Sequence, residues 1–306
     1  MSGFAGMRVF VTGGSGFVGL HLIRALLESG AQVTIWLHQR ELPGDIVTCN
    51  VVRAETLPVD CEALLKCDAV CHVAAYVPPR LEDPTFARQC FEANALLTFQ
   101  LAHIAARNSK MKFVYFSLGM GYLVPPGRPA QETDALYPAA RAPFYLGSKL
   151  LGEIYVESVR WQHSLPWHSL RIGSIYGEGM RASSVPAIFI EQARRRKPLR
   201  VHHGGLPSCD FVHVSDVVFA ALSALRSGEP GIYNVGSGRA SSLLQLAQTV
   251  VEVFGSSSNT EIVPPNGRVP PSFPALNCDK AAAAWNYRPL DLHAGLQRTK
   301  QAMEAA

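Results

Sequence analysis

The sequence predicts an α/β fold, in which a doubly wound parallel sheet carries a smaller, interleaved C-terminal lobe. A glycine-rich turn over 13–19 lies between an apolar strand and an amphipathic helix. Strand-like and helix-like segments then alternate to about residue 177, which is typical of a parallel sheet covered by helices on both faces. Beyond that residue, prolines and glycines cluster at 198–207 and 264–274, so we expect a lobe of different organisation there.

The elements of the first half follow from local periodicity. Short apolar runs predict strands over 7–12, 32–37, 46–52, 69–73 and 112–117. Residues 17–29 place apolar side chains on one helical face and stop at Gly30, which predicts a helix. The same spacing predicts helices over 91–107 and 144–161.

The second half contributes mostly helices. Helical periodicity is present over 186–196, 216–226, 243–254, 280–285 and 293–305. Two further apolar runs, 168–172 and 231–235, are expected to return to the main sheet. The two lobes are therefore expected to interleave along the chain.

Composition and charge exclude several classes of protein. The 306 residues are 48% apolar and 17% charged with a net charge of +4, which excludes disordered, collagen-like and coiled-coil chains and gives no basis for nucleic-acid binding. No apolar run approaches the roughly 20 residues that span a bilayer, and a strand begins where a secretory signal would lie. The seven cysteines form no CxxC pair, so we expect reduced thiols, no metal site and a cytoplasmic protein.

The glycine-rich turn is the strongest local signal of a binding site. Its sequence is Thr-Gly-Gly-Ser-Gly-Phe-Val-Gly over 12–19. In a Rossmann-like sheet, such a turn lets the backbone approach a pyrophosphate at the start of the helix. We expect the cofactor to contact Gly13, Ser15, Gly16, Phe17, Val18 and Gly19. We accordingly assign a dinucleotide-binding domain to 1–177, its sheet completed by about 210–236, and a mainly substrate-binding lobe to 178–306.

A tyrosine and a lysine form the candidate catalytic pair. Tyr145 and Lys149 are four residues apart in a predicted helix and so share one face. With the GxxGxxG spacing of the turn, this pair resembles the extended short-chain dehydrogenase/reductase superfamily. The resemblance implies that Lys149 lowers the pKa of the Tyr145 phenol and holds the nicotinamide ribose. Tyr145 then exchanges a proton with a sugar or alcohol oxygen.

Further motifs resemble the nucleotide-sugar epimerase/dehydratase branch of that superfamily, in their order and spacing. They are His-Val-Ala-Ala at 72–75, Asn94, Leu-Arg at 170–171, Ile-Tyr-Gly at 175–177, Asp-Phe at 210–211, Tyr-Asn-Val-Gly-Ser-Gly at 233–238, Arg268 and Asp-Lys at 279–280. The resemblance implies that Ala74 and Ala75 line the nicotinamide pocket. It also implies that substrate contacts Tyr76, Tyr122, Ser174 and Arg268, and that Arg171 serves a diphosphate.

The chain departs from the branch at the usual serine or threonine pair after the fifth strand. Ser117 is the only hydroxyl left in the run 116–121, because Leu118 or Gly119 stands where the second is expected. Ser117 is therefore the third candidate catalytic residue. Two roles are open for Ser117: it serves the reacting oxygen if its loop shifts, and otherwise it only satisfies backbone groups.

The second departure concerns cofactor choice. Leu37 stands where the branch has an acidic ribose ligand, and His38 and Arg40 follow it. The lack of a carboxylate and the two basic side chains favour the 2′-phosphate of NADP, with NAD as the alternative. Glu55 is a loose substitute for the acidic residue after the third strand.

We therefore expect an NAD(P)-dependent oxidoreductase acting on a nucleotide-activated sugar, most simply the reduction of a 4-keto hexulose with hydride from NADPH and a proton from Tyr145. A 4-epimerase with retained NAD, a dihydroflavonol-type ketone reductase and a catalytically impaired cofactor-binding regulator are the alternatives. Dehydration is disfavoured because the run 117–121 holds no carboxylate. Helices 91–107 and 144–161 resemble the pair that forms a dimer in this superfamily, so a homodimer is expected.

Overall fold

The computed structural model describes residues 3–38, 41–44, 46, 48–54, 61–137, 142–226, 229–255, 257–267 and 269–305. The chain divides into two compact units. The first comprises Met1–Leu118, Tyr137–Arg171 and Val218–Tyr233, and the second comprises Gly119–Leu136, Ile172–Val217 and Asn234–Ala306. Each unit is therefore assembled from separate stretches of chain. The functional boundary at residue 177 stays a prediction.

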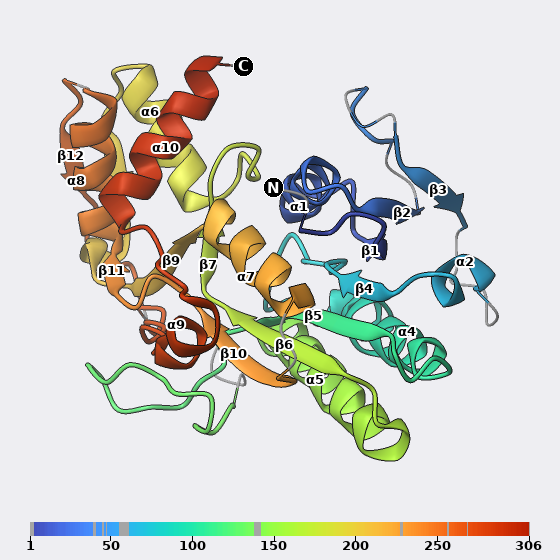
Figure 1. Cartoon of the computed structure of the whole chain (residues 1–306). Helices are drawn as coiled ribbons and strands as arrows, with labels where there is room; N and C mark the ends of the chain where they lie inside the picture. Colours follow the sequence, from blue (N-terminus) through green and yellow to red (C-terminus); the bar gives the residue numbers. More distant parts are fainter. Residues whose placement is uncertain are drawn as a thin grey trace. The chain divides into compact units, whose positions relative to one another are not determined.

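A seven-stranded sheet forms the first unit, in the order β10-β6-β5-β4-β1-β2-β3 (Figure 1). Its strands are β1 (Arg8–Thr12), β2 (Gln32–Leu37), β3 (Asn50–Arg53), β4 (Ala69–His72), β5 (Lys112–Leu118), β6 (Trp167–Ile172) and β10 (Gly231–Val235). The pairs β1–β2, β1–β4, β2–β3 and β4–β5 are parallel. This order confirms the doubly wound sheet and the return of 168–172 and 231–235 to it.

Helices cover both faces of this sheet (Figure 1). They are α1 (Phe17–Glu28), α2 (Glu62–Leu65), α3 (Ala87–Cys90), α4 (Leu97–Ala105) and α5 (Pro143–His163), with the 3-10 turn η1 (Pro84–Phe86) and the π-helix η2 (Phe91–Leu96) before α4. The apolar faces of α4 and α5 pack on the sheet around Phe10, Phe113 and Tyr115. Parallel strands buried on both faces need such apolar runs, which is why the sequence shows them.

In the described residues, the second unit combines short strands with five helices, of which α7 begins here and ends in the first unit. Its elements are β7 (Ser174–Tyr176), α6 (Val185–Arg194), β8 (Leu199–Val201), η4 (His203–Gly205), β9 (Ser208–His213), α7 (Val214–Arg226), β11 (Ala240–Ser242), α8 (Leu243–Phe254), β12 (Thr260–Ile262), α9 (Asp279–Trp285) and α10 (Leu292–Ala305). Strands β11, β9 and β7 form one small sheet and β12 pairs with β8. The core of this unit lies where α6, α8 and α10 meet these strands.

Two of the predicted elements differ from those in the structure. The third strand begins at Asn50, four residues later than expected. The expected helix 91–107 begins as the π-helix η2 and continues as α4 only to Ala105. A π-turn leaves no trace in apolar periodicity, and single π-turns often mark functional positions.

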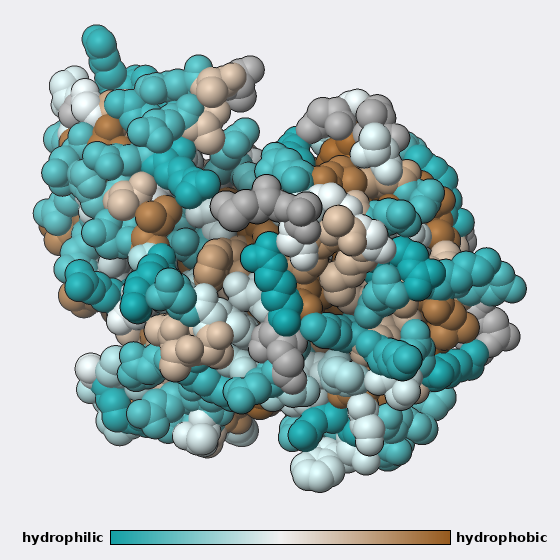
Figure 2. All heavy atoms as spheres, viewed as in Figure 1, coloured by the Kyte–Doolittle hydropathy of each residue, from teal (hydrophilic) through white to brown (hydrophobic). Residues whose placement is uncertain are grey.

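One face of the molecule carries mostly polar side chains. Figure 2 shows hydrophilic residues over most of the viewed face, with small apolar groups between them. Over the residues that the structure describes, no helix combines the length and apolarity needed to cross a bilayer.

Candidate active site

The glycine-rich turn lies at the carboxyl end of β1, as the sequence predicts. Gly13 has a φ of +72°, and a Cβ there would lie 2.6 Å from the backbone nitrogen of Ala74. The Gly16 N–H donates to the Gly13 carbonyl over 3.0 Å and closes the turn before α1. Ser15 to Val18 are partly exposed. The backbone amides at the start of α1 therefore remain accessible to an anion.

The chain after β4 lies against this turn. The Ala74 N–H donates to Thr12 Oγ1 over 3.3 Å, and β4 pairs with β1 up to His72. Ala74, predicted to line the cofactor pocket, is thus held beside Gly13. Ala75 follows as an exposed residue. The order of the sheet reverses between β1 and β4, which is where open α/β sheets bind ligands.

His72 is a neutral ring in a fixed tautomer. The Thr98 hydroxyl donates to the Asn94 carbonyl over 2.7 Å, so Thr98 Oγ1 accepts from His72 Nε2 over 2.8 Å. His72 Nδ1 then accepts from the Thr12 hydroxyl over 2.7 Å. Burial, and then the charge of Lys149, lower the pKa of His72 well below its usual value. His72 therefore fixes structure between β1, β4 and α4 rather than exchanging protons.

Asn94, within η2, joins three parts of the site. Its side-chain oxygen accepts from the Tyr76 N–H over 2.7 Å, and its amide donates to the Tyr76 carbonyl over 3.0 Å. The same amide donates to Ser148 Oγ over 3.0 Å, and Ser148 donates to the Tyr145 carbonyl. The fully buried Asn94 thus positions both the predicted substrate residue Tyr76 and the turn of α5 that carries Tyr145.

Tyr145 and Lys149 lie one turn apart on α5, as predicted. Tyr145 is partly exposed, whereas Lys149 is 2% exposed and its Nζ lies 4.3 Å from the centre of the Tyr115 ring. Within the described part of the chain, Lys149 Nζ makes no hydrogen bond. Burial lowers the pKa of Lys149 to about 7, and the charge of Glu153 opposes that shift. A buried amine requires a polar partner, and none of the described residues supplies a hydrogen bond to this one.

Gly152 permits α5 to approach the sheet closely. A Cβ at this position would lie 2.6 Å from both the Asn94 carbonyl oxygen and the Tyr115 hydroxyl. The Tyr115 hydroxyl donates to the Lys149 carbonyl over 2.9 Å. The close approach of α5 at Gly152 and this hydrogen bond together fix the distance between Lys149 and the Tyr115 ring.

A buried ion pair lies one further turn along α5. Arg171 donates from Nε and Nη2 to Glu153 Oε1 over 3.0 and 2.6 Å, and Ser169 donates to Oε2 over 2.6 Å. The two charged side chains are 7% and 4% exposed. Because its guanidinium is buried and bound to Glu153, Arg171 does not fit the expected role of a diphosphate ligand.

The residues 116–121, in which Ser117 is the only hydroxyl residue, lie at the end of β5. Ser117 is 8% exposed and Leu118 is 4% exposed. At Gly119, a Cβ would lie 2.6 Å from Leu276 Cδ1, so an apolar side chain fills the space where a residue larger than glycine would project. Ser117 carries the one hydroxyl of the run 116–121, and its role toward a reacting oxygen stays a prediction.

The predicted substrate residues of the second unit are held by buried polar contacts. The Tyr122 hydroxyl donates to Asn234 Oδ1 over 2.7 Å, and the Asn234 amide donates to the Ala130 carbonyl over 2.9 Å. Ser174 opens β7 and pairs in register with Phe211 of β9. These contacts shape the second unit, and the roles of Tyr122 and Ser174 toward substrate stay predictions.

Asp210 organises the second unit near these residues. Its carboxylate accepts from the Ser237 and Gly238 amides over 2.6 and 3.1 Å and from the Leu276 amide over 3.0 Å. Burial raises the pKa of Asp210, and these hydrogen bonds oppose the rise. The Asp-Phe motif thus ties the strand end at 233–238 to the segment around Leu276.

Several predicted cofactor and substrate residues cannot be placed. Arg40, Glu55 and Arg268 lie outside the described residues. His38 is exposed directly after β2, and Leu37 is buried.

The residues of the first unit fit a dinucleotide. The turn leaves Ser15 to Val18 partly exposed at the start of α1, beside Ala74, and the buried Lys149 amine makes no hydrogen bond within the described chain. The Gly13 turn would hold the pyrophosphate, and Lys149 would hold a ribose hydroxyl. Bound there, the cofactor would carry the hydride of an oxidation or reduction.

Sequence reasoning did not identify three residues that the structure brings into this site. They are Thr98 and Ser148, which link His72, Asn94 and Tyr145, and Glu153, which faces Lys149. Of the three, only Glu153 could have been identified from the sequence, because it continues the four-residue spacing of Tyr145 and Lys149 on one helix face. Thr98 and Ser148 act through contacts between distant segments.

Comparison with known proteins agrees with this site. The sequence pattern of the NAD dependent epimerase/dehydratase family matches residues 9–236. The mouse dTDP-D-glucose 4,6-dehydratase is 30% identical over 281 residues, covering 83% of this chain and 76% of the relative. The dTDP-4-dehydro-6-deoxy-D-allose reductase of Streptomyces bikiniensis is 26% identical, covering 97% and 96%. The structure of UDP-glucose 4-epimerase from Thermus thermophilus in complex with NAD is 29% identical, with a TM-score of 0.82 over 98% and 100% of the chains.

Proposed function

The chain belongs to the NAD dependent epimerase/dehydratase family, and within it we propose that it reduces the 4-keto group of a nucleoside-diphosphate hexulose with NADPH. Its relatives are sugar-nucleotide epimerases, dehydratases and reductases, so it is an enzyme of this kind. The observation that carries the proposal is the partly exposed Tyr145 one helical turn from the buried Lys149. The reductase of Streptomyces bikiniensis, which matches this chain nearly end to end, supports the choice of reaction.

The chain's own residues would act on the proton. Tyr145 donates its phenolic proton to the ketone oxygen as that oxygen gains charge. The Lys149 ammonium stabilises the phenolate that remains, and Ser117 donates a hydrogen bond to the same oxygen. Asn94 and Ser148 hold the helical turn of Tyr145 in place.

Selection of NADP over NAD is part of the proposal. A buried Leu37 in place of a ribose acid and the exposed His38 after it support NADP. A 4-epimerase with retained NAD is the second candidate, favoured by the NAD complex of the Thermus enzyme. A location in the cytoplasm, where the thiols stay reduced, remains a prediction.

The first prediction tests the reaction itself. Single-turnover mixing of the protein and NADPH with a 4-keto nucleotide sugar should consume one equivalent of NADPH and yield the 4-hydroxy product. An epimerase would instead interconvert UDP-glucose and UDP-galactose without net NADPH loss, with tightly retained NAD. Binding of cofactor with no turnover of either sugar would contradict both candidates.

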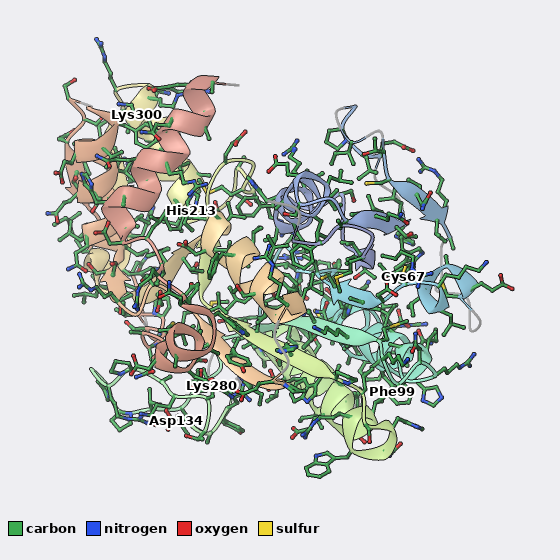
Figure 3. All side chains as sticks on the ribbon, viewed as in Figure 1. Cys67, Phe99, Asp134, His213, Lys280 and Lys300 are labelled. Atoms are coloured by element: carbon green, nitrogen blue, oxygen red, sulfur yellow. The ribbon has the colours of Figure 1, made fainter. Side chains whose placement is uncertain are left out.

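We also propose that the first unit forms a homodimer through η2, α4 and α5. These elements expose the large apolar side chains of Phe91, Phe99, Ile154 and Trp161 at 43%, 39%, 52% and 74%. Phe99, labelled in Figure 3, contacts Tyr155 of α5 edge-on at 5.6 Å between ring centres. Apolar patches of this kind commonly mark interfaces between subunits.

The second prediction concerns this assembly. The protein should elute as a dimer by size-exclusion chromatography with light scattering, and Phe99→Glu with Ile154→Glu should convert it to a monomer. The change places charge in a surface that the dimer would desolvate. Leu123→Glu, at a more exposed apolar residue of the second unit, is the control and should remain dimeric. A monomeric wild type would contradict the proposal.

A further inference from the structure

An arginine lies beside the residue that replaces the ribose acid. Strands β2 and β3 are parallel, with Trp36 paired to Val52 and Leu37 paired to Arg53. Trp36 and Val52 pack together in the core on one face of the sheet. Because side chains alternate between faces along a strand, Leu37 and Arg53 share the opposite face. Arg53 is the last residue of β3, at the carboxyl edge of the sheet.

This edge is continuous with the glycine-rich turn. Thr12, which ends β1 and precedes Gly13, pairs with Trp36 of β2. Neighbouring strands lie about 4.8 Å apart, so Arg53 lies about 10 Å along the edge from the end of β1. An adenosine extending from a pyrophosphate at the turn would cross this edge toward β2 and β3. The side chain of Arg53 therefore borders the place where the adenine ribose would lie.

The Arg53 guanidinium holds a carboxylate from the chain. Nη1 donates to Glu41 Oε1 over 2.9 Å and Nη2 donates to Oε2 over 2.5 Å, a bidentate contact. The side chains are 57% and 74% exposed. An ion pair this exposed is weakly held in water, so a competing anion can replace the carboxylate at little cost. A phosphate matches the same two donors of a guanidinium fork.

We infer that Arg53 and Glu41 are specificity-determining residues for the cofactor. Arg53 exchanges the Glu41 carboxylate for the 2′-phosphate of NADP. Glu41 competes with that phosphate for Arg53 and so limits the preference for NADP over NAD. The inference rests on the proposed use of NADPH. It adds Arg53, from β3, to the basic residues His38 and Arg40 that follow β2.

The test measures binding of cofactor, without turnover. Dissociation constants for NADPH, NADH and the fragment 2′,5′-ADP would be measured by calorimetry for the wild type, Arg53→Met and Glu41→Gln. Arg53→Met should weaken NADPH and 2′,5′-ADP about tenfold and leave NADH unchanged, because only the phosphate loses a charged hydrogen-bond donor. Glu41→Gln should tighten both phosphate ligands several-fold. Raised salt should reduce these differences.

Arg8→Met is the matched control. Arg8 makes a similar exposed ion pair with Asp68, side chains 49% and 42% exposed, but at the amino end of β1, the opposite edge of the same sheet. This variant should leave all three dissociation constants unchanged. A loss of NADPH affinity equal to that of Arg53→Met would show a general charge effect and overturn the inference.

The remaining outcomes separate this inference from the proposed function. One outcome is that the wild type prefers NADPH, and that Arg40→Ala weakens NADPH binding whereas Arg53→Met does not. The inference is then overturned and the NADPH proposal stands. If the wild type has no preference for NADPH but Glu41→Gln creates one that Arg53→Met abolishes, the inference stands and the NADPH proposal fails. Loss of NADH affinity in Glu41→Gln would make Glu41 a ribose ligand and overturn the inference.

Discussion

Replacing Tyr145 by phenylalanine should lower turnover of the keto sugar by about 10²–10⁴-fold, the usual contribution of a general acid. The change removes one oxygen and leaves the ring in place on α5, so the dissociation constant of the cofactor should barely move. Stopped-flow measurement of NADPH oxidation under single-turnover conditions separates the two quantities. The Ser117→Ala variant should lose less, because it removes one hydrogen bond to the reacting oxygen and leaves the proton donor in place.

Tyr155→Phe is the control for this experiment. Tyr155 lies on the same helix, where it contacts Phe99 and not the Lys149 amine. Removal of its hydroxyl should leave turnover unchanged. Full activity in Tyr145→Phe would show that the proton comes from another group, and the assignment of the site would fail.

The pH dependence provides a second readout of the same pair. Burial lowers the pKa of Lys149 to about 7, so the ammonium is present below that pH and is lost above it. The ammonium stabilises the phenolate that Tyr145 leaves behind, so kcat/KM for reduction should fall as the pH rises through about 7. Tyr145→Phe should abolish this dependence, because no phenolate then forms.

The doubly wound sheet was predictable because its signals are local. The turn 13–19, the apolar strands around it and the four-residue spacing of Tyr145 and Lys149 each lie within one segment. The structure bears out the predicted strands of the first unit and the helices 17–29 and 144–161 to within two residues, except that β3 begins four residues late. The predicted helix 91–107 begins as η2, and the short helices α2 and α3 were not predicted. Strands β7, β8, β11 and β12 were not predicted, because three residues are too few to show an alternating pattern. The six-residue strand β9 was also not predicted.

The supporting contacts of the site were not predictable from the sequence. Asn94 joins Tyr76 and Ser148, which are 18 and 54 residues away, and only the fold brings them together. The ion pair between Arg53 and Glu41 was not predictable either, because the register of β2 and β3 places Arg53 beside the end of β2, a few residues before Glu41. Spacing along a chain identifies side chains on one helix, whereas these contacts depend on the distance between separate elements.

Replacing Glu153 by glutamine should lower the free energy of unfolding by about 3–5 kcal/mol, the usual cost of breaking a buried ion pair by removing one partner. The substitution keeps the shape of the side chain but leaves the buried Arg171 guanidinium without its counter-charge. It also removes the negative charge that supports the Lys149 ammonium, so the pKa of Lys149 should fall further. Urea unfolding followed by tryptophan fluorescence measures the first effect, and the pH dependence of turnover measures the second.

Glu157→Gln, one turn further along α5, is the matched control. Glu157 is partly exposed, and a change at such a surface position usually alters stability by no more than about 0.5 kcal/mol. The double variant Glu153→Leu with Arg171→Met removes both charges, and apolar replacement of a whole buried pair is often neutral. It should therefore regain most of the lost stability while keeping the lowered pKa of Lys149. If Glu153→Gln were as stable as Glu157→Gln, the buried pair would contribute nothing to the fold. The pH dependence of turnover would then be the remaining test of whether the Glu153 charge raises the pKa of Lys149.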